Sequence, residues 1–233
     1  MKYSYDLIKK SLHSQESWSN VLIIKHITLP LVFFMVNFTR ITPNIISLLS
    51  LLFGLASAYA YFYGYVLFGG ILYFISYIFD ATDGKVARIK KTGKVYGAWM
   101  DLFIDRVNLV LISTAISYNY FATTNNVSLI FINSVFLGIV FIGSESRYNI
   151  DLFKLKHNMN DLKVDLKKSK YLKWCENQGL IKYPISLPEL FLFYLIFAPY
   201  LKIEYPSLIF ISFFLIGRIV MQQKFWIDVI KNK

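Results

Sequence analysis

Apolar residues dominate this chain in runs long enough to cross a lipid bilayer, and short polar stretches separate those runs. A transmembrane helix needs about 20 mostly apolar residues. Runs of this kind occupy six segments, at 43–64, 65–82, 96–118, 127–146, 186–201 and 206–224. The pattern therefore predicts an all-α fold, an integral membrane bundle of six transmembrane helices.

The segment 17–38 has a different pattern, because its apolar residues mix with Trp18 and Lys25. Its purely apolar part is only about a dozen residues long, which is too short to span a bilayer. It predicts an amphipathic helix that lies on the cytoplasmic membrane interface. We therefore expect an N-terminal interfacial segment over 1–42 and a six-span domain over 43–233.

The distribution of basic residues predicts the orientation, since Lys and Arg gather on the cytoplasmic side of short loops. The turns at 64–70 and 119–128 carry neither residue, and the turn at 199–206 carries only Lys202. Both termini and the Lys-rich segment 158–180, which predicts a second surface helix, are then cytoplasmic. The sequence thus predicts a multi-pass membrane protein whose termini and basic loops face the cytoplasm.

Composition agrees with this assignment and limits the partners. Of the 233 residues, 56% are hydrophobic and 17% are charged, a balance too apolar for an ordinary soluble domain. The formal net charge of +11 fits contact with anionic lipid headgroups at the cytoplasmic surface. Nucleic acid is not an expected partner, because the basic residues follow the membrane topology and no nucleic-acid fold signature is present.

Four aspartates, Asp80, Asp83, Asp101 and Asp105, occur where the second apolar run ends and the third begins. An ionised carboxylate at membrane depth costs about 2.5–3.5 kcal/mol on insertion scales, and neighbouring carboxylates also repel one another. Their spacings of three and four put each pair on one helical face. Divalent cations relieve both costs and typically bridge carboxylates to phosphate oxygens. The cluster predicts a magnesium or manganese site that handles a phosphorylated substrate.

Residues 80–105 read D-x2-D-G-x2-A-R-x8-G-x3-D-x3-D, and at every fixed position this spacing resembles the signature of the CDP-alcohol phosphotransferase family. The predicted spans, the surface N-terminal helix and the Thr42-Pro43-Asn44 start of the first span resemble the same family. The resemblance implies a phospholipid-synthesis enzyme that transfers a substituted phosphate from a CDP-linked alcohol to an acceptor hydroxyl and releases CMP. It also implies a homodimer with its active site on the cytoplasmic side.

The resemblance implies roles for individual residues. The four aspartates would hold two divalent ions, Mg²⁺ or Mn²⁺, and Asp105 would also be the general base for the attacking hydroxyl. The residues expected to bind the CDP-alcohol are Asn44, Gly84, Ala87, Arg88 and Gly97. Arg147 and Arg218, the remaining cations near the membrane, are candidates for acceptor binding if they face the pocket, and otherwise they anchor helix ends. Lys94 departs from the pattern, since many members carry Ser or Thr at that position.

Two other functions would also use aspartates near a membrane. An intramembrane prenyltransferase binds a magnesium diphosphate, but its two acidic motifs lie on well-separated helices, whereas Asp83 and Asp101 are 18 residues apart. A divalent-cation transporter usually places such residues in related halves, and this sequence contains no repeat. Within the resembled family the donor is either CDP-diacylglycerol or a CDP-linked polar alcohol. The absence of charge over 45–54 favours members resembling the choline/ethanolamine or inositol-phosphate types.

Overall fold

The computed structural model describes most of the chain, in the ranges 3–10, 16–156, 174–175, 177–178, 180–181 and 186–231. Within these ranges the regular structure is helical, and one isolated parallel bridge pairs Glu16 with Leu180. The predicted all-α fold is therefore confirmed. The surface helix predicted for 158–180 falls almost entirely outside the described residues.

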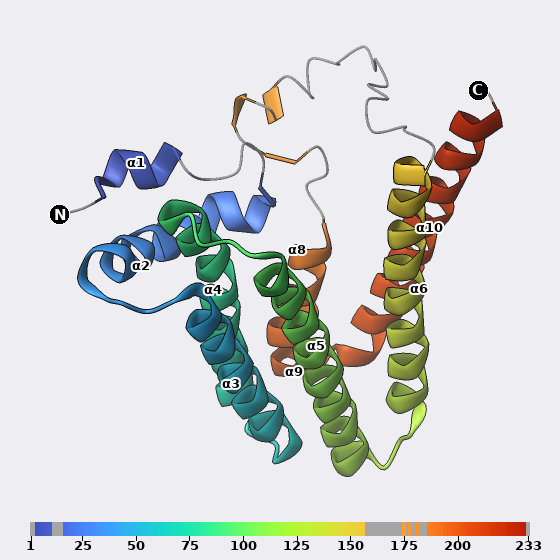
Figure 1. Ribbon diagram of the computed structural model, residues 1–233. Coiled ribbons are helices and arrows are strands. Elements are labelled where there is room, and N and C mark those ends of the chain that lie inside the picture. The colour runs from blue at the N-terminus through green and yellow to red at the C-terminus, as the bar shows by residue number, and fades with distance from the viewer. Residues whose placement is uncertain are drawn as a thin grey trace. The chain divides into compact units, whose positions relative to one another are not determined.

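Short connections join the helices from α2 to α6 and from α8 to α10 (Figure 1). In chain order they are α1 (Tyr5–Lys10), the π-helical η1 (Asn20–Ile24), α2 (Lys25–Phe38), α3 (Pro43–Phe62), α4 (Val66–Lys90), α5 (Val95–Thr124), α6 (Ser128–Lys156), α8 (Leu187–Leu192), the π-helical η2 (Phe193–Phe197), α9 (Ala198–Leu201) and α10 (Glu204–Lys231). Each of the six predicted spans coincides with one long helix or, over 186–201, with the consecutive helices α8, η2 and α9.

Several of these helices have the length and composition of membrane spans. Five qualify among the described residues, at Asn20–Phe38, Pro43–Phe62, Val66–Lys90, Ser128–Phe153 and Glu204–Ile227. The apolar helix Leu187–Leu201 is shorter. The 30-residue α5 is not among the five, and polar residues are spread along its whole length. The count of six spans stays a prediction.

The chain divides into two compact units. The first comprises Met1–Asn119 with Lys168–Lys202, and the second comprises Tyr120–Lys167 with Ile203–Lys233. In the second unit α6 packs against α10, where Gln223 donates a hydrogen bond from Nε2 to Oγ of Ser146. The predicted division of the chain after residue 42 stays a prediction.

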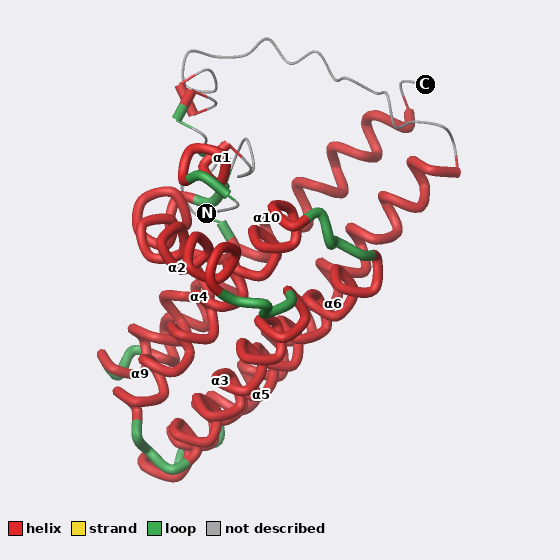
Figure 2. Tube along the Cα trace, turned by 60° about the vertical axis from the view of Figure 1, so that its left-hand side comes forward, coloured by secondary structure: helices red, strands yellow, loops and turns green. Residues whose placement is uncertain are grey.

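In the first unit α3 and α4 form an antiparallel pair packed along their length (Figures 1 and 2). Small hydroxyl side chains hold the two backbones close. Ser57 donates from Oγ to the carbonyl oxygen of Gly69 at 2.7 Å, and Ser76 donates to that of Ser50 at 2.7 Å. Small and hydroxyl residues permit this close approach between apolar helices, which have little hydrophobic drive to associate in lipid.

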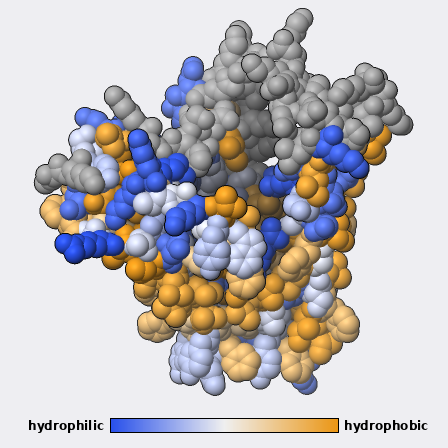
Figure 3. Space-filling view, in the orientation of Figure 1, coloured by the Kyte–Doolittle hydropathy of each residue, from blue (hydrophilic) through white to orange (hydrophobic). Residues whose placement is uncertain are grey.

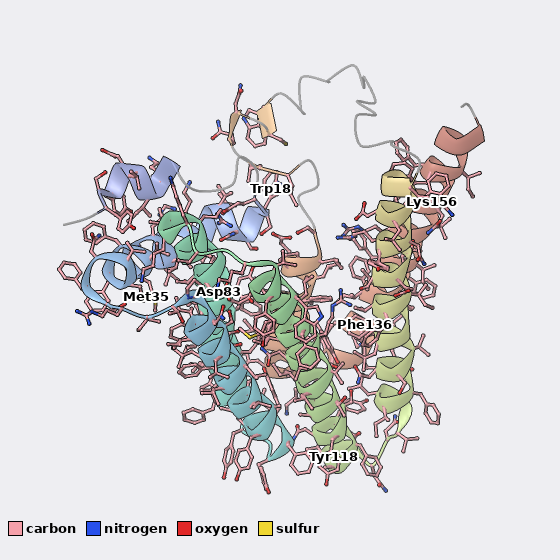
Figure 4. All side chains as sticks on the ribbon, viewed as in Figure 1. Trp18, Met35, Asp83, Tyr118, Phe136 and Lys156 are labelled. Carbon is pink, nitrogen blue, oxygen red and sulfur yellow. The ribbon has the colours of Figure 1, made fainter. Side chains whose placement is uncertain are left out.

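Helix α2 covers the end of α4 that carries the acidic motif. Its inward-facing side chains are Leu29, Val32, Met35 and Val36, of which Met35 is labelled in Figure 4. They share a buried cluster with Ile46 at the start of α3 and with Val86 and Ile89 in the last turns of α4. On the face seen in Figure 3, hydrophilic side chains of the first unit gather at this same end, above a hydrophobic surface over α3. The expectation that the segment 17–38 is too short to cross a bilayer is wrong, because Asn20–Phe38 has the length and composition of a membrane span. Its interfacial position stays a prediction.

Candidate active site

The acidic motif occupies the last turns of α4, a four-residue connection and the first turns of α5. Helix α4 ends at Lys90, and Lys91 takes a left-handed backbone conformation with φ of 53°. The N–H of Thr92 then bonds to the carbonyl oxygen of Ala87 at 3.0 Å, a hydrogen bond typical of a helix C-terminus with a left-handed residue. The chain reverses within a few residues, so the end of α4 and the start of α5 lie at the same end of the unit.

Helix α3 begins at this end too. Thr42 is extended, Pro43 occupies the first helical turn, and the carbonyl oxygen of Thr42 accepts the N–H groups of Ile45 and Ile46 at 3.1 and 3.3 Å. The Thr42 side chain makes no capping hydrogen bond, so the helix start depends on backbone contacts and on the fixed φ of proline. Asp83 lies where the ends of α3, α4 and α5 meet (Figure 4).

The structure brings three of the four aspartates together. One carboxylate oxygen from each of Asp80, Asp83 and Asp101 lies within 4.8 Å of the others. Asp101, from α5, is in direct contact with both aspartates of α4. Asp83 is buried, while Asp80 and Asp101 are partly exposed. We call these three residues the aspartate trio.

Asp105 flanks the trio, one helical turn beyond Asp101. Its carboxyl group contacts that of Asp80, and it is exposed at the surface of the described chain. A carboxylate that borders the trio and remains accessible can meet a substrate group directly.

The aspartate trio fits a divalent cation. Two oxygens bound to one Mg²⁺ at about 2.0–2.1 Å lie at most about 4.2 Å apart, so the observed 4.8 Å limit requires only small side-chain rotations. Carboxylates are the hard oxygen ligands that Mg²⁺ and Mn²⁺ prefer. Packing three of them together without a cation costs Coulomb repulsion on top of desolvation, and a bound ion offsets both costs.

Sequence reasoning missed one member of this site, Ser47 on α3. Its hydroxyl donates a hydrogen bond to Oδ2 of Asp83, and both side chains are 5% exposed. The only signal in the sequence is that Ser47 follows Asn44 by three positions and therefore shares its helical face. Serine is common in apolar helices, so this spacing alone did not distinguish it.

The small residues of the motif lie beside polar side chains at the same end. A Cβ on Gly97 would lie 3.5 Å from Oδ1 of Asn44, so the starts of α3 and α5 adjoin there. A Cβ on Gly84 would lie 3.4 Å from Nη1 of Arg88, so the guanidinium folds back over this glycine. Ala87 lies between Gly84 and Arg88 on α4 and is partly exposed.

Comparison with known proteins agrees with this arrangement. The sequence profile described as CDP-alcohol phosphatidyltransferase matches residues 40–174, which is more than half of the chain. The chain belongs to this family. The predicted resemblance is thereby confirmed, and the protein is an integral, multi-pass membrane member of the CDP-alcohol phosphatidyltransferases.

One curated relative is the Bifunctional IPC transferase and DIPP synthase of Aquifex aeolicus (strain VF5), which is 39% identical over 67 residues. That match covers 29% of this chain and 15% of the relative, so the chain spans a small part of that protein's length. A crystal structure of Mycobacterium tuberculosis phosphatidylinositol phosphate synthase with CDP-DAG bound matches with a TM-score of 0.62 and 16% identity. This match covers 85% of the present chain and 92% of the mycobacterial one, which shows a common fold.

The two candidate acceptor-binding residues lie outside the first unit. Arg147 is exposed on α6 and Arg218 is partly exposed on α10, both in the second compact unit. The aspartate trio, Ser47 and the motif glycines all belong to the first unit. A role for the two arginines in acceptor binding stays a proposal.

Proposed function

We propose that this protein transfers a substituted phosphate from a CDP-linked alcohol to an acceptor hydroxyl and releases CMP, in phospholipid synthesis. The observation that carries the proposal is the aspartate trio, in which two helix ends of a family member present three carboxylates within 4.8 Å of one another. Carboxylate oxygens are ligands that suit the divalent ions that bind diphosphates. The CDP-DAG held by the mycobacterial structure is a donor of the proposed class.

In the proposed site the aspartate trio, with Asp105 beside it, holds two divalent ions, Mg²⁺ or Mn²⁺. When bound, these ions neutralise the donor's diphosphate and stabilise the leaving CMP. Asp105 borders the trio beside Asp80, so it is the carboxylate we assign to removing the proton of the acceptor hydroxyl.

The donor would lie against the uncovered helix backbones. Gly84, Ala87 and Gly97 leave room for the cytidine, and Asn44 borders Gly97. Arg88 offers a planar fork of donors that suits a phosphate. Arg147 and Arg218 are the residues we propose for acceptor binding in the assembled protein.

The distribution of Lys and Arg supports an active site on the cytoplasmic side, with both termini on that side. We propose that the six apolar segments all cross the membrane and that the segment 17–38 lies on the interface. A homodimer is the proposed assembly, and anionic lipids are the proposed surroundings of the basic cytoplasmic face.

The deciding experiment uses the purified full-length protein in detergent with labelled CDP-diacylglycerol or CDP-linked polar alcohols, each offered with lipid, glycerol phosphate or inositol phosphate acceptors. We expect CMP release that requires both Mg²⁺ or Mn²⁺ and one acceptor class, and that disappears with EDTA or in Asp80→Ala. Release of pyrophosphate from a prenyl diphosphate, or ion flux into vesicles without CMP, would identify one of the other two functions and overturn this one.

A further inference from the structure

Ser47 connects α3 to the aspartate trio. Its hydroxyl donates to Oδ2 of Asp83 and also lies 3.2 Å from the carbonyl oxygen of Pro43, one turn earlier in α3. A serine hydroxyl has one proton, and an ionised carboxylate is a stronger acceptor than a carbonyl. The hydroxyl therefore donates its hydrogen bond to Asp83, and not to Pro43, whenever the Asp83 carboxyl group is ionised.

This contact differs from the other hydroxyl contacts described between α3 and α4, because they reach backbone or another hydroxyl and no carboxylate. Ser57 and Ser76 donate to backbone carbonyl oxygens, whose positions the helices already determine. Ser47 donates to a side-chain carboxylate, whose orientation the helix backbone alone does not fix. Its hydrogen bond therefore restricts the orientation of a carboxylate and does more than join two helices.

We propose that Ser47 is a positioning residue for the divalent-metal site, which holds the Asp83 carboxylate in the orientation that an ion requires. The inference rests on the proposed function, because it takes the aspartate trio to be the metal ligands. A partner that orients a metal-binding side chain is typically worth about 10–100-fold in metal affinity. Ser47 would supply this without touching the ion or the substrate.

The test is the dissociation constant of Mn²⁺ for the purified full-length protein without any nucleotide, measured by the loss of the free Mn²⁺ signal in electron paramagnetic resonance. In Ser47→Ala we expect this constant to rise by about 10–100-fold. The matched control is Ser50→Ala, one turn further along the same face, where the lost hydroxyl meets Ser76 and no carboxylate. There we expect wild-type Mn²⁺ affinity, whatever the change in melting temperature.

A second pair of variants tests the same hydroxyl if Ser47→Ala fails to fold. Thr and Val have nearly the same shape, so Ser47→Thr and Ser47→Val share any steric cost and differ in the hydroxyl. We expect the Thr variant to bind Mn²⁺ more tightly than the Val variant by the same factor that separates Ser from Ala.

Equal Mn²⁺ affinity in wild type and Ser47→Ala, or equal affinity in the Thr and Val variants, would overturn the positioning role and leave the proposed function intact. An equal loss in Ser50→Ala would also overturn it, because the effect would then come from helix packing. Failure of the wild-type protein to bind Mn²⁺ at all would instead remove the metal site on which the proposed function depends.

Discussion

The side-chain amide of Asn108 fills the space beside the α carbon of Gly54. A Cβ on Gly54 would lie 2.1 Å from Oδ1 of Asn108, so the two helices can meet this closely only because residue 54 has no side chain. Asn108 is 6% exposed and donates from Nδ2 to Oγ of Ser76 at 3.4 Å. Helices α3, α4 and α5 therefore meet two turns away from Asp101, and this contact limits how far α5 can move from the other two.

We expect Gly54→Ala to destabilise the protein by about 1–3 kcal/mol, the usual cost of an overpacked interior, and to weaken Mn²⁺ binding because α5 carries Asp101. Both are measured on the purified protein, by thermal melting with and without Mn²⁺. Gly138→Ala on α6 is the control, since a Cβ there meets no atom within 4 Å. Adding Asn108→Ala should restore much of the loss, and a Gly54→Ala protein that melts like the wild type would contradict the packing argument.

Asp105→Asn should separate catalysis from binding. Loss of a general base typically costs about 10²–10⁴-fold in rate, so we expect turnover to fall by that factor. Stabilisation of the protein by Mn²⁺ and a CDP-alcohol should persist in thermal melts, because the aspartate trio remains. Asp80→Ala should abolish that stabilisation, and Asp6→Asn, at an exposed position in α1, should behave as the wild type. Full turnover in Asp105→Asn would remove the base assignment.

Gly97→Ala tests whether the nucleotide needs the bare backbone at the start of α5. The new methyl group would lie 3.5 Å from Asn44, an ordinary contact, and the exchange of Gly for Ala inside a helix favours folding by up to about 1 kcal/mol. We therefore expect unchanged or higher thermal stability together with a raised KM for the CDP-alcohol. Gly93→Ala, in the connection where a Cβ meets no atom within 4 Å, is the control. An unchanged KM would exclude Gly97 from the donor site.

Lys85 lies inside the acidic motif but points to the N-terminal segment. It is 2% exposed, and its Nζ donates to Oγ1 of Thr28 at 3.2 Å and to Oδ1 of Asn20 at 3.4 Å. We expect Lys85→Met to cost about 1–3 kcal/mol, because it leaves the buried Thr28 hydroxyl without this donor, and to speed hydrogen exchange over 17–28. Lys91→Met, at an exposed residue, should do neither. Unaltered exchange over 17–28 would show that Lys85 does not hold this segment.

Hydropathy predicted where the helices lie better than where they end. The predicted run 65–82 became α4, Val66–Lys90, because the polar motif continues the helix after its apolar part has ended. The run 186–201 became three short helices with a π-helical turn at Phe193–Phe197. Hydrophobicity reports burial in lipid, and it carries little information about local changes of helical hydrogen bonding.

The site was predictable where its residues are close in sequence. Spacings of three and four placed Asp80 with Asp83, and the short connection after Lys90 brought Asp101 to them. Contacts across longer separations were not predictable. Ser47 meets Asp83 across 36 positions, and Gly54 meets Asn108 through a fit of shapes that no periodic pattern encodes.

Asp83 is buried among three helix ends, and the aspartate trio joins α4 to α5. A cation bound there would tie together two helices whose carboxylates otherwise repel each other. In the proposed site the ions would therefore contribute to the architecture of the first unit as well as to its chemistry.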